Sequence, residues 1–210
     1  KGYAMATDGD RLLLVYNEEP YKPSEALAMG KLVSIVATGS TPVEVDLSAC
    51  GTFANFVHQA AAADVREASM VNLIFSGGTG DYGALSVTGG GMNFQGVTFE
   101  ANRGSKYGAL VLFGANDGMP TLPVEMAGCQ FLNNVNQGEN GGAVTIVGGA
   151  ELHIRNSLFQ NNTCLAGDGG AISVGAEVVL RVGGSTFTSN AAGGRGGAIN
   201  VDGQNKADIM

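Results

Sequence analysis

The feature of the sequence that most constrains the fold is a repeat of about 28 residues in the second half of the chain. One copy begins at Gly141 and reads GGAVTIVGGAELHIRNSLFQNNTCLAGD before the next Gly-Gly-Ala starts. Each copy contains a tripeptide of small residues, two apolar runs and a Phe-x-x-Asn motif. The motif phenylalanines are separated by 32, 28 and 28 residues and are Phe99, Phe131, Phe159 and Phe187. A fixed period of this length with strand-like content is typical of a solenoid.

Within each repeat, apolar residues alternate with residues that are often polar. Seven and five residues before the motif phenylalanine stand Met92 and Phe94 in one copy, and Leu152 and Ile154 in another. Alternation with a period of two indicates a strand with one buried face. One repeat alone could not bury that face, so several repeats must stack. The sequence therefore predicts an all-β parallel β-helix with three strands per coil and about six to seven coils.

The Phe-x-x-Asn motif recurs in phase with Gly-Gly-Ala-(Ile/Leu/Val) over residues 75–203. This pairing resembles the repeat of the chlamydial polymorphic membrane proteins, and related repeats occur in other bacterial and algal surface proteins. The resemblance implies a right-handed, single-stranded parallel β-helix, a pectate-lyase-like solenoid. It brings no catalytic residues with it. Solenoids of this kind serve as adhesins, lyases and inert stalks, so the resemblance is more specific for fold than for function.

We expect a single domain over residues 1–210, with irregular early coils and a partial cap over 1–74 and regular coils over 75–203. Alanines favour helix, and the Ala-rich stretch near 54–68 is expected to form a short helix or a long loop. Residues 114–123 lengthen one coil by four residues relative to its successors. Such an excursion is a candidate contact loop, but we favour the interpretation that it is an inert insertion.

The early part of the chain contains four strand candidates. Arg11 to Tyr16 includes LLLV and is expected to be a buried strand. Lys31 to Ala37 and Val43 to Leu47 are separated by a turn that contains proline. Met70 to Phe75 is expected to be the strand with which the regular solenoid begins.

Composition excludes some classes of partner. The formal net charge of −8 argues against a nucleic-acid ligand, which requires a basic surface. No apolar run approaches the roughly 20 residues of a membrane-spanning helix. Lys1 is not a start residue, and the pattern is still repeat-like at the other end, so we expect a fragment of a larger secreted protein. The C-terminal strand edge is then expected to be covered by further coils or another subunit, and the isolated fragment to associate end to end.

The three cysteines are not expected to pair with one another. Cys129 precedes its motif phenylalanine by two residues, whereas Cys164 follows its own by five, which places them at different points of the cross-section. Cys129 is expected to be a small buried core residue. Cys50 has no assigned phase, and its partner is left open. His58 and His153 have no other ligand residue at metal-binding spacing and are expected to be ordinary surface residues.

A ladder of asparagines accompanies the phenylalanines. Asparagine tolerates left-handed backbone, and stacked amides can bond from coil to coil, so we expect a structural rather than a catalytic role. The ladder residues are Asn102, Asn134, Asn162 and Asn190. Asn161 begins an Asn-Asn-Thr sequon, which is a candidate glycosylation site if the source is eukaryotic.

Acidic residues precede several of the tripeptides. Asp81, Glu139 and Asp168 are a candidate ligand-binding or Ca²⁺-binding turn, because Ca²⁺ prefers clustered carboxylates and carbonyls. Lys106 and Arg195 occupy the corresponding turn in other coils, and aspartate beside glycine also has a purely conformational explanation. No other metal and no cofactor is expected.

Two classes of function compete. The first is a non-enzymatic, extracellular structural or adhesive segment of a large cell-surface protein, which projects or assembles other parts. Its partners would be other domains or copies of the same protein, glycans, or a protein on a host or cell surface. The second is a carbohydrate-active enzyme or a glycan-binding module, which two carboxylates about 5–10 Å apart in a cleft would favour. End-to-end assembly into a filament is a third interpretation.

Overall fold

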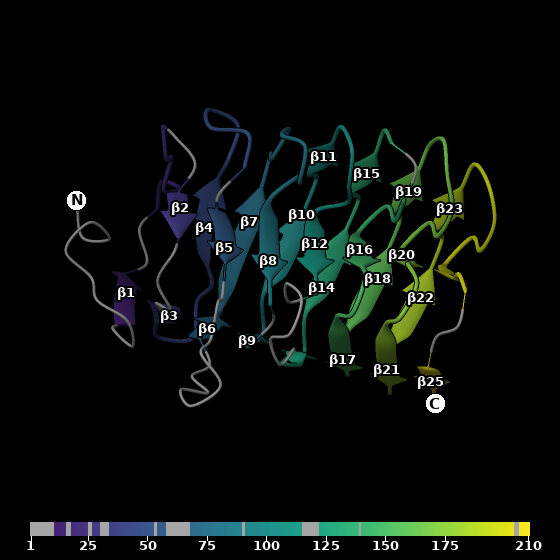
Figure 1. The fold of residues 1–210 in the computed structure, drawn as a ribbon. Coiled ribbons are helices and arrows are strands. Elements are labelled where there is room, and N and C mark those ends of the chain that lie inside the picture. The colour runs from purple at the N-terminus through teal and green to yellow at the C-terminus, as the bar shows by residue number, and fades with distance from the viewer. Residues whose placement is uncertain are drawn as a thin grey trace.

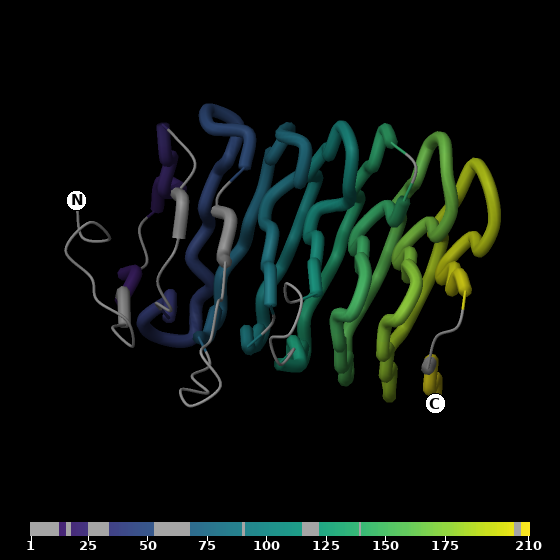
Figure 2. The backbone as a smooth tube through the Cα atoms, in the orientation of Figure 1, coloured from purple at the N-terminus to yellow at the C-terminus, as the bar shows by residue number. Residues whose placement is uncertain are grey.

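The computed structural model describes residues 11–15, 18–24, 27–29, 34–52, 54–57, 68–89, 91–114, 122–138, 140–203 and 206–210. Parallel strands follow one another from the purple N-terminal end to the yellow C-terminal end (Figure 1) and build a β-solenoid. The tube through the Cα atoms shows the chain winding as successive coils along one axis (Figure 2). The predicted parallel β-helix is therefore confirmed. The described residues include no helix that is long and apolar enough to span a membrane.

Sheet 1 is the longest ladder, with eight parallel strands. In spatial order its strands are β1 (Arg11–Val15), β3 (Ser34–Thr38), β6 (Ala68–Val71), β9 (Met92–Gln95), β13 (Val124–Ala127), β17 (Glu151–Arg155), β21 (Val179–Gly183) and β25 (Lys206–Ile209).

Sheet 2 carries the motif phenylalanines and has six strands. They are β4 (Val43–Asp46), β7 (Leu73–Ser76), β10 (Thr98–Glu100), β14 (Gln130–Leu132), β18 (Leu158–Gln160) and β22 (Thr186–Thr188).

Sheet 3 consists of four strands of two residues each, and sheet 4 has seven strands. The strands of sheet 3 are β11 (Arg103–Gly104), β15 (Val135–Asn136), β19 (Thr163–Cys164) and β23 (Ala191–Ala192). Those of sheet 4 are β2 (Leu27–Met29), β5 (Ala54–Val57), β8 (Leu85–Thr88), β12 (Leu110–Phe113), β16 (Val144–Val147), β20 (Ile172–Val174) and β24 (Ile199–Val201).

Six successive coils each contribute one strand to sheets 1, 2 and 4. We number them coil 1 (β3–β5), coil 2 (β6–β8), coil 3 (β9–β12), coil 4 (β13–β16), coil 5 (β17–β20) and coil 6 (β21–β24). Strands β1 and β2 precede these coils in the ladders, and β25 follows them. Coils 3 to 6 add the short fourth strand of sheet 3 to the three strands that were predicted, and these are also the coils with a ladder asparagine.

The core is a continuous stack of apolar side chains inside the coils. Inward-facing residues of β13 and β17, such as Met126 and Leu152, are fully buried, whereas their outward neighbours are only partly buried. Five phenylalanines belong to the largest fully buried side chains and are Phe75, Phe94, Phe99, Phe131 and Phe159. Burial of this kind is the main favourable term for the fold, at about 2–3 kcal/mol per large side chain.

Two predictions about the early strands were wrong in detail. The stretch from Met70 to Phe75 forms two strands, β6 and β7, because Asn72 adopts left-handed backbone (φ 58°) and turns the chain from sheet 1 into sheet 2. Strand β1 was expected to be buried, but Leu13 and Val15 are exposed, while Leu14 is partly buried and packs against the core. Alternation explains this, since one face of a strand points outward.

The expected helix or long loop near 54–68 begins as a strand. Residues Ala54–Val57 form β5, which pairs in parallel with β8, and β6 begins at Ala68. Residues 58–67, which include His58, lie outside the described residues. The same holds for residues 115–121 of the predicted excursion and for Glu139.

Candidate functional site

The phenylalanine ladder fills the corner of the interior beneath sheet 2. The rings of Phe99 and Phe131 stack with centroids 4.8 Å apart, and both following steps, to Phe159 and to Phe187, are 4.7 Å. Phe187 is partly buried, while the three preceding rings are fully buried. Phe75 is a further member that sequence reasoning left out, and its ring lies 5.5 Å from that of Phe99.

Gly78 explains why the motif around Phe75 was missed. It stands where the following coils have asparagine, so the Phe-x-x-Asn pattern is absent from coil 2. The backbone N–H of Gly78 instead donates to Oδ1 of Asn102 at 2.9 Å. The tripeptide Tyr82-Gly83-Ala84, seven residues after Phe75, was the available signal.

The asparagine ladder satisfies its own amides inside the protein. Nδ2 of Asn134 donates to Oδ1 of Asn162 at 2.9 Å and to the carbonyl oxygen of Phe99 at 2.9 Å. Oδ1 of Asn162 also accepts a bond from the backbone N–H of Asn134 at 3.1 Å. The same bonds recur at Asn102 and between Asn162 and Asn190. The side-chain amides of Asn102, Asn134 and Asn162 are thus each bonded to the next coil and to the phenylalanine of the preceding coil, and the amide of Asn190 donates to the Phe159 carbonyl oxygen at 2.9 Å.

Asp81 and Asp168, the two of the three acidic residues that the structure describes, do not come together. Asp81 and Asp168 lie at the same corner but three coils apart, which is about 14 Å at the usual strand spacing. Asp81 accepts a bond from the Ser105 hydroxyl at 2.6 Å, and Asp168 accepts one from the backbone N–H of Arg195. Lys106 occupies the next coil beyond Asp81. No group of three or more His, Cys, Asp or Glu side chains among the described residues is arranged to hold a metal ion.

Asn161 lies at an exposed corner. Its backbone is left-handed (φ 55°), and its side-chain Nδ2 donates to Oδ1 of Asn133 on the preceding coil at 3.2 Å. The side chain of the sequon asparagine is therefore at the surface, in contrast to the buried Asn162 beside it.

A row of charged side chains crosses the outer face of sheet 1, and sequence reasoning missed it. Nδ1 of His153 lies 2.6 Å from Oε1 of Glu125, and Nε2 lies 2.8 Å from Oε1 of Glu151. Arg155 pairs with Glu125 at 3.1 Å, and Arg181 pairs with Glu151 at 2.5 Å. We call these five residues the charged row. His153, expected to be an ordinary surface residue, is its centre.

The charged row could have been recognised by aligning the repeats on their motif phenylalanines. Glu125, His153 and Arg181 each stand six residues before a motif phenylalanine, and their strands pair them directly across coils 4, 5 and 6. Burial by itself raises the pKa of Glu151, but the hydrogen bonds from His153 and Arg181 outweigh it and hold that pKa below its ordinary value.

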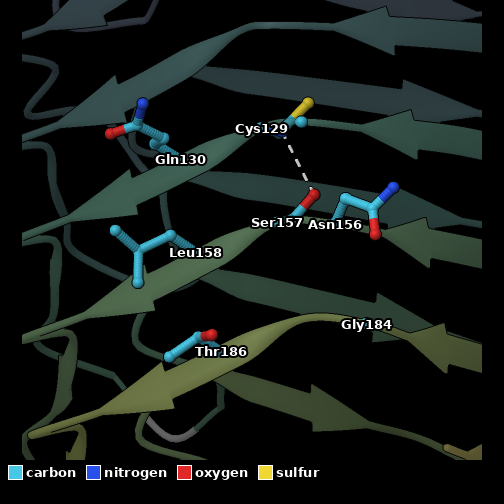
Figure 3. Close-up of a pocket in the computed structure, with 8 residues that line it drawn as sticks. Cys129, Gln130, Asn156, Ser157, Leu158, Gly184 and Thr186 are labelled. Carbon is cyan, nitrogen blue, oxygen red and sulfur yellow. Dashed lines mark hydrogen bonds between the residues drawn. The ribbon is translucent and has the colours of Figure 1, made fainter.

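A surface groove of about 400 Å³ adjoins the charged row, at the corner where sheet 1 turns into sheet 2. Figure 3 shows Gln130, Leu158 and Thr186 following one another on neighbouring strands, with Asn156 beside them. The lining residues are Gly128, Cys129, Gln130, Asn156, Ser157, Leu158, Gly184 and Thr186. Among these described residues there is no carboxylate, histidine, lysine or arginine.

The floor of the groove is fixed by serine hydroxyls. Ser157 Oγ accepts a bond from the Cys129 N–H at 3.1 Å and donates to the Arg155 carbonyl oxygen at 2.9 Å. The same bond recurs between coils 5 and 6, where Ser185 Oγ accepts from the Ser157 N–H at 3.1 Å. These bonds leave the exposed side chains of Gln130, Asn156 and Thr186 as the polar groups that a ligand would meet.

No two of the three cysteines form a disulfide with each other in the structure. Cys129 and Cys164 are buried, and Cys50 is partly buried. Burial raises the pKa of Cys129 to about 11. Its thiol is therefore protonated at neutral pH, and the thiol, unlike the thiolate, is a poor nucleophile.

Comparison with protein families supports the repeat assignment. Residues 156–175 and 184–202 match the model of the Chlamydia polymorphic membrane protein (Chlamydia_PMP) repeat. The matched segments contain the Phe-x-x-Asn motifs of coils 5 and 6 and the tripeptides that follow them. Comparisons with curated proteins and with solved structures found no match. Within residues 156–175 and 184–202 the chain is therefore similar to the chlamydial repeat, and the described residues form a parallel β-solenoid.

Proposed function

We propose that this β-helix is a non-enzymatic structural or adhesive segment of a large cell-surface protein, outside the cell, where it projects or assembles other parts. The observation that carries the proposal is the chemistry of the groove. Its described lining offers amides, hydroxyls and glycine backbone, and its one titratable group is the buried Cys129. Such a lining is suited to binding rather than to proton transfer or nucleophilic attack.

The repeat family supports a location at the cell surface. The matched model is named for a membrane protein of Chlamydia. The stacked coils also suit a spacer, because each coil contacts mainly its neighbours and the solenoid extends by about 4.8 Å per coil. Phe and Asn ladders that continue from coil to coil favour a stiff rod.

One observation favours the competing class of carbohydrate-active enzyme. Glu125 and Glu151 lie on either side of one imidazole, so two carboxylates are close together on the outer face of sheet 1. Both carboxylates are, however, paired with an arginine as well as with His153. General acid catalysis requires a carboxyl that holds its proton near neutral pH, whereas these bonds lower the pKa of Glu151.

The test combines an adhesion assay with a turnover assay. Beads coated with the folded chain should bind to cells or to beads that carry the same chain, and heat-unfolded chain should not support this. No new reducing ends or unsaturated products should appear when the chain is incubated with a panel of polysaccharides. Turnover that is lost in both Glu125→Gln and Glu151→Gln would replace the proposal with the enzyme, and the absence of any adhesion or self-association would overturn it.

A further inference from the structure

We infer that the groove at the corner between sheets 1 and 2 is a binding site for a neutral saccharide. The inference rests on the proposed function, because it supplies a ligand class for the adhesive role.

The groove exists because side chains are missing on both sides of Asn156. Residues at this corner have left-handed backbone and form one row across the coils, namely Asn72, Gly96, Gly128, Asn156 and Gly184. A Cβ atom added to Gly128 would meet no atom within 4 Å, and one added to Gly184 would lie 2.7 Å from Asn156 Oδ1. The space beside Gly128 is therefore open and an asparagine would fill it, whereas the Asn156 side chain already lies over Gly184.

The lining can recognise hydroxyl groups. Gln130 and Asn156 each present an amide with both donors and an acceptor, and Thr186 presents a hydroxyl. Leu158 is half-buried and adds an apolar patch between them (Figure 3). A sugar ring has the matching surface, with hydroxyls at its rim and C–H groups on its faces. The volume of about 400 Å³ lies within the usual range for small-ligand sites, roughly 300–1,000 Å³.

The charge of the surroundings favours a neutral ligand. Arg155 directly precedes Asn156, but its guanidinium is paired with Glu125 at 3.1 Å. An anionic sugar would have to compete with that carboxylate, and a cationic ligand would find no acid in the lining. An uncharged saccharide neither competes with the Glu125 carboxylate nor needs an acidic group in the lining.

The described lining residues on coils 4 and 5 offer a peptide strand no unpaired backbone N–H. The groove lies on coils 4 to 6, and within its lining Thr186 belongs to β22, the end strand of sheet 2. The N–H groups of Gly128, Asn156 and Leu158 already donate to the carbonyl oxygens of Arg155, Gly183 and Cys129. Strand addition depends on free backbone groups at a sheet edge, so a ligand on coils 4 and 5 of the groove must be recognised by side chains.

The chain offers a matched pair of substitutions as the test. Gly128→Asn fills the groove at a left-handed position, and asparagine tolerates this backbone, as Asn156 in the same row shows. Gly96→Asn is the control, since Gly96 lies in the same row, also has nothing within 4 Å of an added Cβ, and does not line the groove. Circular dichroism and thermal melting check that both variants remain folded. Gln130→Ala removes an exposed amide without changing the backbone conformation.

Binding is measured by glycan array with neutral and acidic saccharides, followed by titration calorimetry with the best neutral one. The wild-type chain should bind neutral saccharides, Gly128→Asn and Gln130→Ala should each weaken binding by about tenfold or more, and Gly96→Asn should change it by less than about twofold. Absence of neutral binders, a preference for acidic saccharides, or an equal loss in Gly128→Asn and Gly96→Asn would overturn the inference. Adhesion of beads that is unchanged by Gly128→Asn would overturn the saccharide site while leaving the proposed function standing.

Discussion

A buried asparagine is stable in this interior because every polar atom of its amide has a partner. Nδ2 of Asn162 donates to the Phe131 carbonyl oxygen and to Asn190 Oδ1, while its own Oδ1 accepts from Asn134. An unpaired buried amide would cost about 1–3 kcal/mol. The ladder therefore requires asparagine at each step. Phe159 likewise requires a phenylalanine at the same position of the coils on both sides, because its ring stacks on those of Phe131 and Phe187.

The first residue-scale prediction concerns Phe159→Ala. The ring is fully buried and stacks on both sides, so its loss should leave a cavity and lower the free energy of unfolding by about 3–5 kcal/mol. Phe187→Ala is the matched control, because that ring is only partly buried, and its effect should be clearly smaller. Urea denaturation of the two variants checks this. Equal losses, or a loss below about 1 kcal/mol for Phe159→Ala, would mean that the ladder is not a main part of the core.

The second residue-scale prediction concerns the substitution Asn162→Asp. A carboxylate at this position cannot donate to the Phe131 carbonyl oxygen or to Asn190, and burial raises the pKa of an introduced carboxyl above its unfolded value of about 3.9. The folded variant then binds its proton more tightly than the unfolded chain does. Its stability relative to wild type should be highest below about pH 4 and should fall as pH rises through the folded pKa. Melting temperatures that differ from wild type by the same amount at about pH 4 and pH 8 would contradict the buried ladder.

A single strand of sheet 1 can place apolar side chains on its inner face and charged side chains on its outer face. On β17, Leu152 and Ile154 face the core while Glu151 and His153 belong to the charged row. Because the strands pair in register, charged side chains on neighbouring strands meet although they are 28 or 30 positions apart in the sequence, as in His153 with Glu125 and Arg181 with Glu151. The outer row can therefore bind adjacent coils together across three strands.

Glu151→Gln tests this at the element scale. The pKa of Glu151 is lowered from its ordinary value of 4.5, so its carboxylate contributes stability above that value, and the contribution is lost as pH falls through the folded pKa. At neutral pH the variant should be less stable than wild type by up to about 1 kcal/mol, since the pairs are partly exposed. The difference should shrink at about pH 3 and in high salt. A difference that grows on acidification would show that the charged row does not stabilise the sheet.

The phenylalanine and asparagine ladders could be predicted from the sequence because the same residue type recurs at the same position of successive repeats. Phe159 and Asn162 have counterparts one repeat away on both sides, and residues in phase must stack in a solenoid. Coils of irregular length lacked counterparts at a fixed spacing. The ladder member Phe75 has glycine in place of the motif asparagine, and the strand at Ala54–Val57 resembles a helix in composition but is fixed by its pairing with β8.

The groove could not be predicted in the same way. It depends on what is absent at Gly128 and Gly184, and glycine at a corner is equally consistent with backbone strain alone. His153 was interpreted as a lone histidine because its partner Glu125 lies in another repeat. Only the pairing of β13 with β17 brings the two side chains together.

At the scale of the whole molecule, the described residues form one stack in which each of coils 2 to 5 lies between two neighbouring coils. The strands of sheets 1, 2 and 4 continue through all six coils, so the early irregular part joins the same ladders as the regular part. Stability in such a stack is approximately the sum of coil and interface terms. The surface properties follow from the same stacking, since the charged row and the groove are both built from residues in phase on coils 4 to 6.

Disulfide trapping tests most directly that residues one repeat apart lie side by side. Gln130 and Leu158 are register partners on the outer face of β14 and β18, about 4.8 Å apart at strand spacing, whereas Gln160 is displaced along β18 by two residues. A disulfide requires Cα atoms within about 7 Å. With Cys50 replaced by serine, the pair Gln130→Cys and Leu158→Cys should oxidise to a crosslink that mass spectrometry identifies, and Gln130→Cys with Gln160→Cys should not. Equal yields for both pairs, or a crosslink only in the second, would contradict the stacked register on which the whole account depends.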